Sequence, residues 1–191
     1  TGAKKEVVGT GFVIGGRELT LTYDSMGRPS NQLWYSNFHV RMGVIHMPEG
    51  KLSVHVTRSS GYKESFLVLG ASGDSGACGP TSTHNAAAIS KVGTELQIKS
   101  EASNTIETYT LTGQLTGTKD ALGRSATTTL SDASTPVSIA PAPGYILRIT
   151  DENGRFVDFS YVLPPGQPAA TGGLIQSIAD SSGQTITLGY D

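Results

Sequence analysis

Apolar residues alternate with polar ones in several short windows of the chain. In a β-strand successive side chains point to opposite faces, so this period of two places the apolar residues on one face. No window of comparable clarity has helical spacing, although residues Asn85 to Lys91 could form a short helical turn. The pattern therefore predicts an all-β fold. The alternating residues are Leu19, Leu21 and Tyr23, then Leu52, Val54 and Val56, then Val157, Phe159 and Tyr161, and finally Ile186, Leu188 and Tyr190.

A repeat occupies the second half of the chain. Three segments that begin at Gly113, Gly144 and Gly173 align without gaps, and their starts lie 31 and 29 residues apart. In each segment an Asp follows the first Gly by seven positions, and a second Gly follows that Asp by three. Spacings of this size are typical of repeat architectures, in which neighbouring units bury each other's apolar faces.

Each segment has the chemistry of a β-hairpin. Asp can hydrogen-bond to the backbone that follows it, and Gly can adopt the left-handed conformation, so Asp-x-x-Gly predicts a turn between two strands. The predicted turn residues are Asp120, Gly123, Arg124, Asp151, Gly154, Arg155, Asp180 and Gly183. The predicted packing residues on the flanking strands are Leu115, Ile146, Phe159, Tyr161, Ile175, Leu188 and Tyr190.

The recurring polar residues favour a structural role. An active site needs one constellation of groups, so three equivalent aspartates favour turn formation over catalysis. Arg124 and Arg155 follow the turn glycines, and a guanidinium there could bridge to a carbonyl or an acid on the adjacent repeat. Gln184 takes the same place in the third segment, so a charge is not required there.

Composition narrows the classes of partner. The 191 residues suffice for one domain or a stack of repeats, and the 24 glycines favour short strands joined by tight turns. With 14 basic and 16 acidic residues the net charge is −2, so no basic field favours nucleic acid or anionic lipid. No apolar run approaches the roughly 20 residues of a membrane-spanning helix, and the single cysteine, Cys78, excludes an intrachain disulfide.

Two segments predict surface loops, and the ends of the chain suggest a fragment. Residues Ser131 to Pro143 and Pro164 to Thr171 are rich in Pro, Ala, Ser and Gly. The first residues lack the apolar run of a signal peptide, and the last residues, Leu188 to Asp191, resemble the middle of a repeat. We therefore expect the chain to be an excised part of a longer protein.

The second and third segments resemble the YD repeat of bacterial Rhs proteins. They have Gly144, Asp151, Gly154-Arg155 and Tyr161 in one copy, and Gly173, Asp180, Gly183 and Tyr190-Asp191 in the next. In the first half, Leu19 to Ser25 and Leu33 to Phe38 resemble the segment that opens the Rhs shell, with Leu33 where that family usually has Gly. The resemblance divides the chain into an opening β region, residues 1–110, and three YD-like hairpin repeats, residues 111–191.

The resemblance implies a ribbon of antiparallel hairpins that forms a curved or spiralling sheet, as a segment of a hollow shell. In Rhs proteins that shell encloses a toxic C-terminal domain and is exported to the cell surface or beyond by a dedicated secretion system. The partners implied are the remainder of the parent shell and its enclosed toxin. The chain lacks the Asp-Pro-x-Gly-Leu sequence at which Rhs cores cut themselves, so encapsulation is expected of the parent protein.

Gly73-Asp74-Ser75-Gly76 resembles the nucleophile segment of chymotrypsin-like serine proteases. That chemistry needs a His base and an orienting Asp between the His and the Ser in chain order. His39 precedes Ser75 by 36 residues, yet residues 40 to 73 contain no Asp, and Ala77 replaces the expected Gly. A Ser- and Gly-rich loop is the favoured interpretation, and a small serine hydrolase is the weakest alternative.

Cofactor and metal sites are not predicted. The histidines, His39, His46, His55 and His84, lack the spacing of a metal site, and His55 is expected on the polar face of its strand. Residues Gly9 to Gly15 only superficially match a dinucleotide fingerprint, because they precede a strand. The sequence thus predicts a non-catalytic structural segment. The alternative is a module that binds carbohydrate or a cell surface, and exposed strand edges could also pair with another copy.

Overall fold

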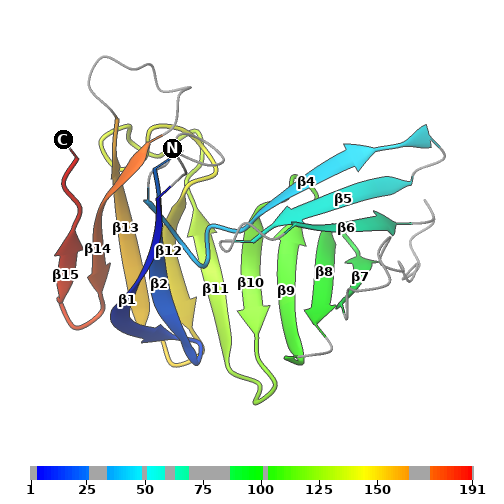
Figure 1. Cartoon of the computed structure of the whole chain (residues 1–191), viewed down its shortest axis with the longest axis horizontal. Helices are drawn as coiled ribbons and strands as arrows, with labels where there is room; N and C mark the ends of the chain where they lie inside the picture. Colours follow the sequence, from blue (N-terminus) through cyan, green and yellow to red (C-terminus); the bar gives the residue numbers. More distant parts are fainter. Residues whose placement is uncertain are drawn as a thin grey trace. The chain divides into compact units, whose positions relative to one another are not determined.

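The computed structural model describes residues 4–25, 34–48, 51–58, 63–68, 87–100, 103–163 and 173–190. Within these ranges the chain consists of antiparallel β-strands and contains no α-helix, which confirms the all-β prediction (Figure 1). The chain forms two compact units. Unit 1 comprises Thr1–His39 and Ala126–Asp191, and unit 2 comprises Val40–Ser125. The predicted division after residue 110 was based on the resemblance of the sequence and not on the compactness of the units. It stays a prediction.

Unit 1 contains two groups of paired strands. One consists, in order, of β1 (Lys5–Ile14), β2 (Arg17–Asp24) and β3 (Trp34–Ser36). The other consists, in order, of β11 (Ser125–Leu130), β12 (Ile146–Asp151), β13 (Phe156–Val162), β14 (Leu174–Asp180) and β15 (Thr185–Thr187). Strands that follow one another in the chain pair with one another, as successive hairpins require. β1 packs against β12 and β13, and β3 packs against β14.

The core of unit 1 follows the predicted alternation. Val157, Phe159 and Tyr161 are buried on β13, while the residues between them are partly exposed. On β2, Leu19 and Leu21 are buried, but the alternation ends there, because Thr22 and Asp24 are buried instead of Tyr23. Tyr23 packs on Trp34, with ring centroids 5.2 Å apart. Among the described residues, the large apolar side chains that unit 1 buries almost completely are those of Ile14, Leu19, Phe38, Ile149, Ile175 and Ile178.

β1 contains a β-bulge. Gly9 pairs with Thr20 and Val13 with Glu18, so three residues of β1 stand opposite Leu19 alone. The Thr10 hydroxyl stabilises this irregularity, because it donates to the Leu19 carbonyl at 2.6 Å and accepts from the Phe12 N–H at 3.1 Å. The bulge buries Phe12 and leaves Gly11 exposed at φ +76°. Bulges redirect side chains in this way and are common beside binding sites.

Unit 2 also contains two groups of paired strands. One consists of β4 (Arg41–His46), β5 (Leu52–Thr57) and β6 (Lys63–Val68), and the other of β7 (Ala87–Val92), β8 (Glu95–Ser100), β9 (Thr105–Thr110) and β10 (Leu115–Lys119). The predicted alternation in β5 is confirmed, since Leu52, Val54 and Val56 are buried and His55 is exposed. The predicted helical turn is wrong where the structure describes it. Residues 87–91 belong to β7, because alternate burial of Ala87 and Ile89 suits a strand.

Gly113 joins the two groups of strands in unit 2. Its carbonyl accepts from the Met42 N–H at 3.0 Å, and its φ is +86°. A Cβ at this position would lie 1.7 Å from the Met42 carbonyl oxygen. Only glycine allows such a close approach between backbones.

The predicted loop from Ser131 to Pro143 contains no strand, and most of its residues are exposed. It is anchored at Ser131, whose hydroxyl donates to the Ala142 carbonyl at 2.7 Å, and at buried Ala140. The other predicted loop, Pro164 to Thr171, lies outside the described residues. No helix within the described ranges has the length and apolar character needed to cross a membrane.

Candidate functional site

The three Asp-x-x-Gly turns share one set of hydrogen bonds. In each turn Oδ1 of the Asp accepts the backbone N–H groups two and four residues later, and the glycine N–H donates to the carbonyl of the Asp. The N–H distances to Oδ1 are 2.9 and 3.0 Å for Asp120, 2.9 and 2.9 Å for Asp151, and 3.0 and 2.9 Å for Asp180. These carboxylates therefore bind their own turns.

The turn glycines adopt the left-handed conformation. Gly123, Gly154 and Gly183 have φ angles of +84°, +79° and +88°. A Cβ at any of them would meet no atom within 4 Å, so backbone conformation and not crowding favours glycine here.

Both turn arginines bind the Asp of their own turn, so the predicted bridge to an adjacent repeat is wrong. Arg124 Nε lies 2.7 Å from Asp120 Oδ2, and Arg155 Nε lies 2.8 Å from Asp151 Oδ2. A second guanidinium nitrogen bonds the same oxygen in each pair, at 2.6 and 2.7 Å. The turn brings residues four apart within reach, so the guanidinium satisfies the nearest carboxylate first.

The third turn replaces the arginine with another donor. The Ser182 hydroxyl lies 2.8 and 2.9 Å from the two carboxylate oxygens of Asp180. This hydroxyl and the turn N–H groups outweigh the opposing effect of burial and lower the pKa of Asp180. The carboxylate is thus satisfied without the side chain of residue 184, and the Gln184 amide makes no hydrogen bond to any described residue.

A tyrosine closes the open end of the second and third hairpins. The Tyr161 hydroxyl donates to the Ile146 carbonyl at 2.8 Å, and the Tyr190 hydroxyl donates to the Ile175 carbonyl at 2.6 Å. Each hydroxyl thus reaches the residue 15 positions earlier. In the first segment the equivalent position is Leu130, which has no hydroxyl to donate. This hydrogen bond from a tyrosine hydroxyl to a carbonyl, called the tyrosine tie below, therefore occurs only in the two later copies.

The predicted packing residues differ in burial. Leu115, Ile146, Phe159, Tyr161 and Ile175 are buried. Leu188 and Tyr190 are half-buried, because they follow β15, which pairs with β14 alone in the described part of the chain. Burial raises the pKa of Tyr190, so its hydroxyl stays protonated and able to donate at neutral pH.

His39 belongs to the aromatic core of unit 1. Its Nε2 lies 3.0 Å from the Tyr161 hydroxyl, and its ring meets Phe159 edge-on with centroids 5.4 Å apart. Its Nδ1 lies 2.7 Å from the Ser36 hydroxyl. Among the described residues no group of three His, Cys, Asp or Glu side chains is placed to hold a metal ion. Ser75, Cys78 and His84 lie outside the described residues.

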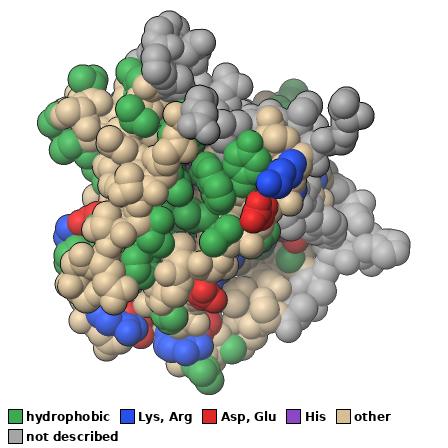
Figure 2. All heavy atoms as spheres, turned by 60° about the vertical axis from the view of Figure 1, so that its left-hand side comes forward, with side chains coloured by type: hydrophobic (Ala, Val, Ile, Leu, Met, Phe, Trp, Pro, Cys, Tyr) green, Lys and Arg blue, Asp and Glu red, His purple; other side chains and the backbone are tan. Residues whose placement is uncertain are grey.

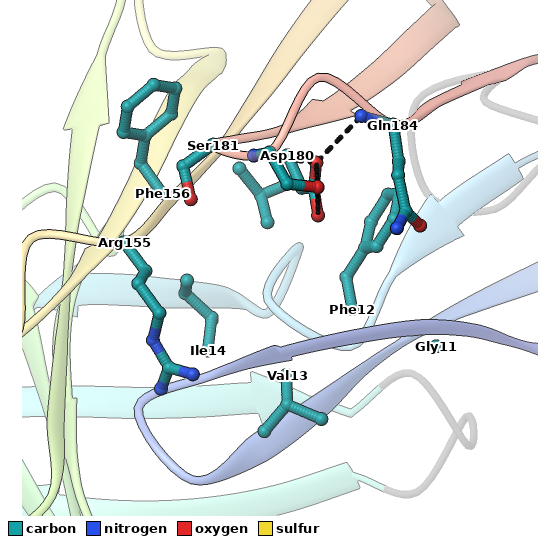
Figure 3. A pocket seen from close by; sticks show the side chains of 11 residues that line it. Gly11, Phe12, Val13, Ile14, Arg155, Phe156, Asp180, Ser181 and Gln184 are labelled. Atoms are coloured by element: carbon teal, nitrogen blue, oxygen red, sulfur yellow. Dashed lines mark hydrogen bonds between the residues drawn. The ribbon is translucent and has the colours of Figure 1, made fainter.

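A pocket of about 300 Å³ lies between the β1 bulge and the third turn (Figure 3). Its walls are Gly11, Phe12, Val13 and Ile14 of β1, Arg155, Phe156 and Val157 at the start of β13, and Asp180, Ser181, Ser182 and Gln184 around the turn. In Figure 3 Arg155 and Gln184 extend from opposite sides of the pocket, above β1. The sequence predicted Arg155 and Asp180 as turn residues but did not predict that they border a pocket.

Figure 2 turns the side of unit 1 that carries β13 to β15 toward the viewer. Hydrophobic side chains gather near the middle of this face, and acidic and basic side chains stand close together below them. β1 contributes exposed Val7, Val8 and Val13 to the apolar surface of unit 1. Among the coloured side chains of this view, basic and acidic groups therefore stand side by side, so the described charges are of both signs.

A buried charged cluster in unit 2 was not predicted. Arg58, after β5, bonds Glu64 of β6 at 2.7 Å and also pairs with Glu107 of β9. The Tyr109 hydroxyl donates to Glu107 at 2.8 Å, and burial together with Glu107 raises the pKa of Tyr109. Tyr109 is fully buried, and the side chains of Arg58, Glu64 and Glu107 are 22%, 12% and 11% exposed, so the main role of the cluster is to join strands. Its residues are far apart in the sequence and carry no motif.

The chain matches no protein-family model and no curated protein.

Proposed function

We propose that this chain is a non-catalytic structural segment of a secreted shell of the Rhs/YD-repeat type. The shell of the parent protein would enclose or deliver a C-terminal toxin domain, and a dedicated secretion system would export it. The contacts of this segment would then be the remaining strands of the shell and the enclosed domain.

The recurring tyrosine tie carries this proposal. Tyr161 and Tyr190 each close a hairpin whose other end is held by an Asp turn. Each hairpin is therefore stabilised at both ends by its own residues. Because each unit contains its own stabilising bonds, such a unit can be repeated many times along a sheet, as in repeat proteins.

Pairing between hairpins supports the same proposal. Val157 to Val162 of β13 pair with Leu174 to Asp180 of β14, with one register shift after Ser160. Buried Phe159 and Tyr161 of β13 then lie opposite buried Ile178 and Ile175 of β14. Stacked hairpins that bury a continuous apolar face give an extended wall, which suits an enclosing role better than a catalytic one.

The full-length parent protein provides the test. We expect its coding sequence to continue with further Gly-Asp-Gly-Tyr segments and then with an unrelated C-terminal domain. In the purified parent, that domain should resist limited proteolysis until the shell is opened, and a Phe159→Ala parent should lose this protection at a lower temperature. A parent without further repeats, or with a C-terminal domain that protease removes at once, would refute the proposal.

A further inference from the structure

We propose that His39 makes unit 1 sensitive to mild acid, because protonation of its imidazole releases the segment that contains β3 from β13. The device is a chain of hydrogen bonds from Ser36 through His39 and Tyr161 to the Ile146 carbonyl, called the His39 network below. The inference goes beyond the proposed function and does not rest on it, since all of these residues belong to unit 1.

A backbone donor fixes the protonation state of His39. The Ser36 N–H donates to His39 Nδ1 at 3.1 Å, and an amide N–H acts only as a donor. Nδ1 is therefore an unprotonated acceptor. In a neutral imidazole the other nitrogen then carries the hydrogen, so Nε2–H donates to the Tyr161 oxygen at 3.0 Å. The imidazole is thus neutral in this fold.

The hydroxyl groups of the network have defined directions as well. The Ser36 hydroxyl accepts from the Phe38 N–H at 3.2 Å, and it donates to His39 Nδ1 at 2.7 Å. The Tyr161 hydroxyl donates to the Ile146 carbonyl at 2.8 Å, so its oxygen is the acceptor for Nε2–H. Both imidazole nitrogens are therefore engaged, and Nδ1 accepts two hydrogen bonds.

A proton on Nδ1 conflicts with this arrangement. It converts the acceptor into a donor, which then faces the N–H and the hydroxyl of Ser36. Ser36 is 0% exposed, so its N–H loses this acceptor in the interior of the protein. A buried donor that loses its partner costs more than an average hydrogen bond contributes. Imidazole ordinarily takes up a proton near pH 6.5, so the conflict begins in mildly acidic solution.

The neighbouring groups do not favour an imidazolium at His39. On the β13 side the titratable groups are the hydroxyls of Tyr161 and of Tyr145, whose rings meet with centroids 4.8 Å apart. A phenol is neutral in mildly acidic solution and provides no opposite charge. On the β2 side Arg17 lies over the Phe38 ring, 5.3 Å from its centroid, and adds a positive charge to the same segment.

The His39 network connects β3 to β13. Ser36 is the last residue of β3, and Tyr161 lies in β13. On its other side β3 pairs with β2, where Leu21 stands opposite Ser36. Protonation of His39 removes the hydrogen-bonded connection to β13 and leaves the pairing with β2 intact. We therefore expect the segment to separate from β13 before the strand pairs of unit 1 break.

The fluorescence of Trp34 tests the proposal, because Trp34 is the single tryptophan of the chain and lies in β3. Between about pH 6.5 and 5 we expect a red shift that reverses on neutralisation. Urea denaturation should show that the folding equilibrium constant falls by up to about tenfold per pH unit, because the unfolded chain then binds one more proton than the folded chain. This range lies above the one in which the Asp turns take up protons.

Two matched variants separate His39 from the other histidines. His39→Gln has a neutral side chain at every pH, so the fluorescence and the stability should no longer change between about pH 6.5 and 5. His55→Gln alters an exposed histidine of unit 2 and should keep both changes. Each variant is compared with itself across pH, so a constant loss of stability from the substitution does not affect the result.

NMR of the ¹⁵N-labelled imidazoles tests the unsubstituted chain directly. At neutral pH His39 should be the Nε2–H tautomer, and its protonation should coincide with the red shift of Trp34. Four results would each overturn the proposal: an Nδ1–H tautomer, protonation of His39 without a fluorescence change, a red shift that persists in His39→Gln, or a folding equilibrium constant that stays level from about pH 6.5 to 5.

Discussion

The second and third hairpins use the same bonds in different surroundings. Both have an Asp turn at one end and a tyrosine tie at the other. Tyr161 is 2% exposed on β13, which lies between β12 and β14, whereas Tyr190 is half-buried beyond β15. The repeat thus sets which bonds form, and the place of the strand in the sheet sets how much each bond stabilises the fold.

The largest difference between the hairpins is expected on removing an apolar side chain. Phe159→Ala leaves a cavity beside His39 and should lower the free energy of unfolding by about 3–5 kcal/mol. Leu188→Ala, at the equivalent position of the third hairpin, should cost only about 1 kcal/mol, since that side chain is half-buried. Urea denaturation measures both values, and equal losses would show that the two hairpins have the same surroundings in solution.

The tyrosine hydroxyls should differ in the same direction. Tyr161→Phe removes the hydroxyl donor of the buried Ile146 carbonyl and a partner of His39, so we expect a loss of about 1–3 kcal/mol. Tyr190→Phe should cost about 0.5–1.5 kcal/mol. Tyr190 is half-buried, so water can replace the lost hydroxyl as a donor to the Ile175 carbonyl. Thermal unfolding of the two variants side by side provides the measurement. A larger loss for Tyr190→Phe would contradict the order.

Acid should weaken the second turn. Burial opposes ionisation of Asp151, but hydrogen bonds from Arg155 and from the turn N–H groups outweigh it and lower the pKa of this carboxyl. A lowered folded-state pKa stabilises the fold above the unfolded value of about 4, and this contribution is lost as pH falls from about 5 to 3. Urea denaturation across that range should show the decline. The decline should be smaller in Arg155→Ala. Gln184→Ala removes no bond to Asp180, so its decline should equal that of the unsubstituted chain.

The smallest effect is expected from making the third turn more like the second. Gln184→Arg adds an exposed Asp–Arg pair at Asp180, and exposed pairs add little stability. The unfolding midpoint should therefore stay level or rise slightly. A clear decrease would mean that the pocket does not accommodate a guanidinium bound to the turn as Arg124 and Arg155 are.

The local chemistry of the hairpins was predictable from the sequence, and the contacts between distant residues were not. Alternation and the Asp-x-x-Gly spacing predict β13 and its turn, because both depend on residues a few positions apart. The partner of Arg155 was predicted wrongly, since spacing alone does not say whether a long side chain turns back on its own loop. The β1 bulge and the Arg58 cluster depend on residues that folding brings together, and no short sequence pattern predicts them.

Gly113 limits what variation this chain can accept. At Gly123, Gly154 and Gly183 there is open space for a side chain, so Asn, which tolerates the left-handed conformation, is a workable substitute. At Gly113 even a methyl group would collide with the Met42 carbonyl. A library of single substitutions should thus find Gly113 irreplaceable. The reason is its contact with Met42, about seventy positions earlier in the chain, which the place of Gly113 in the repeat does not reveal.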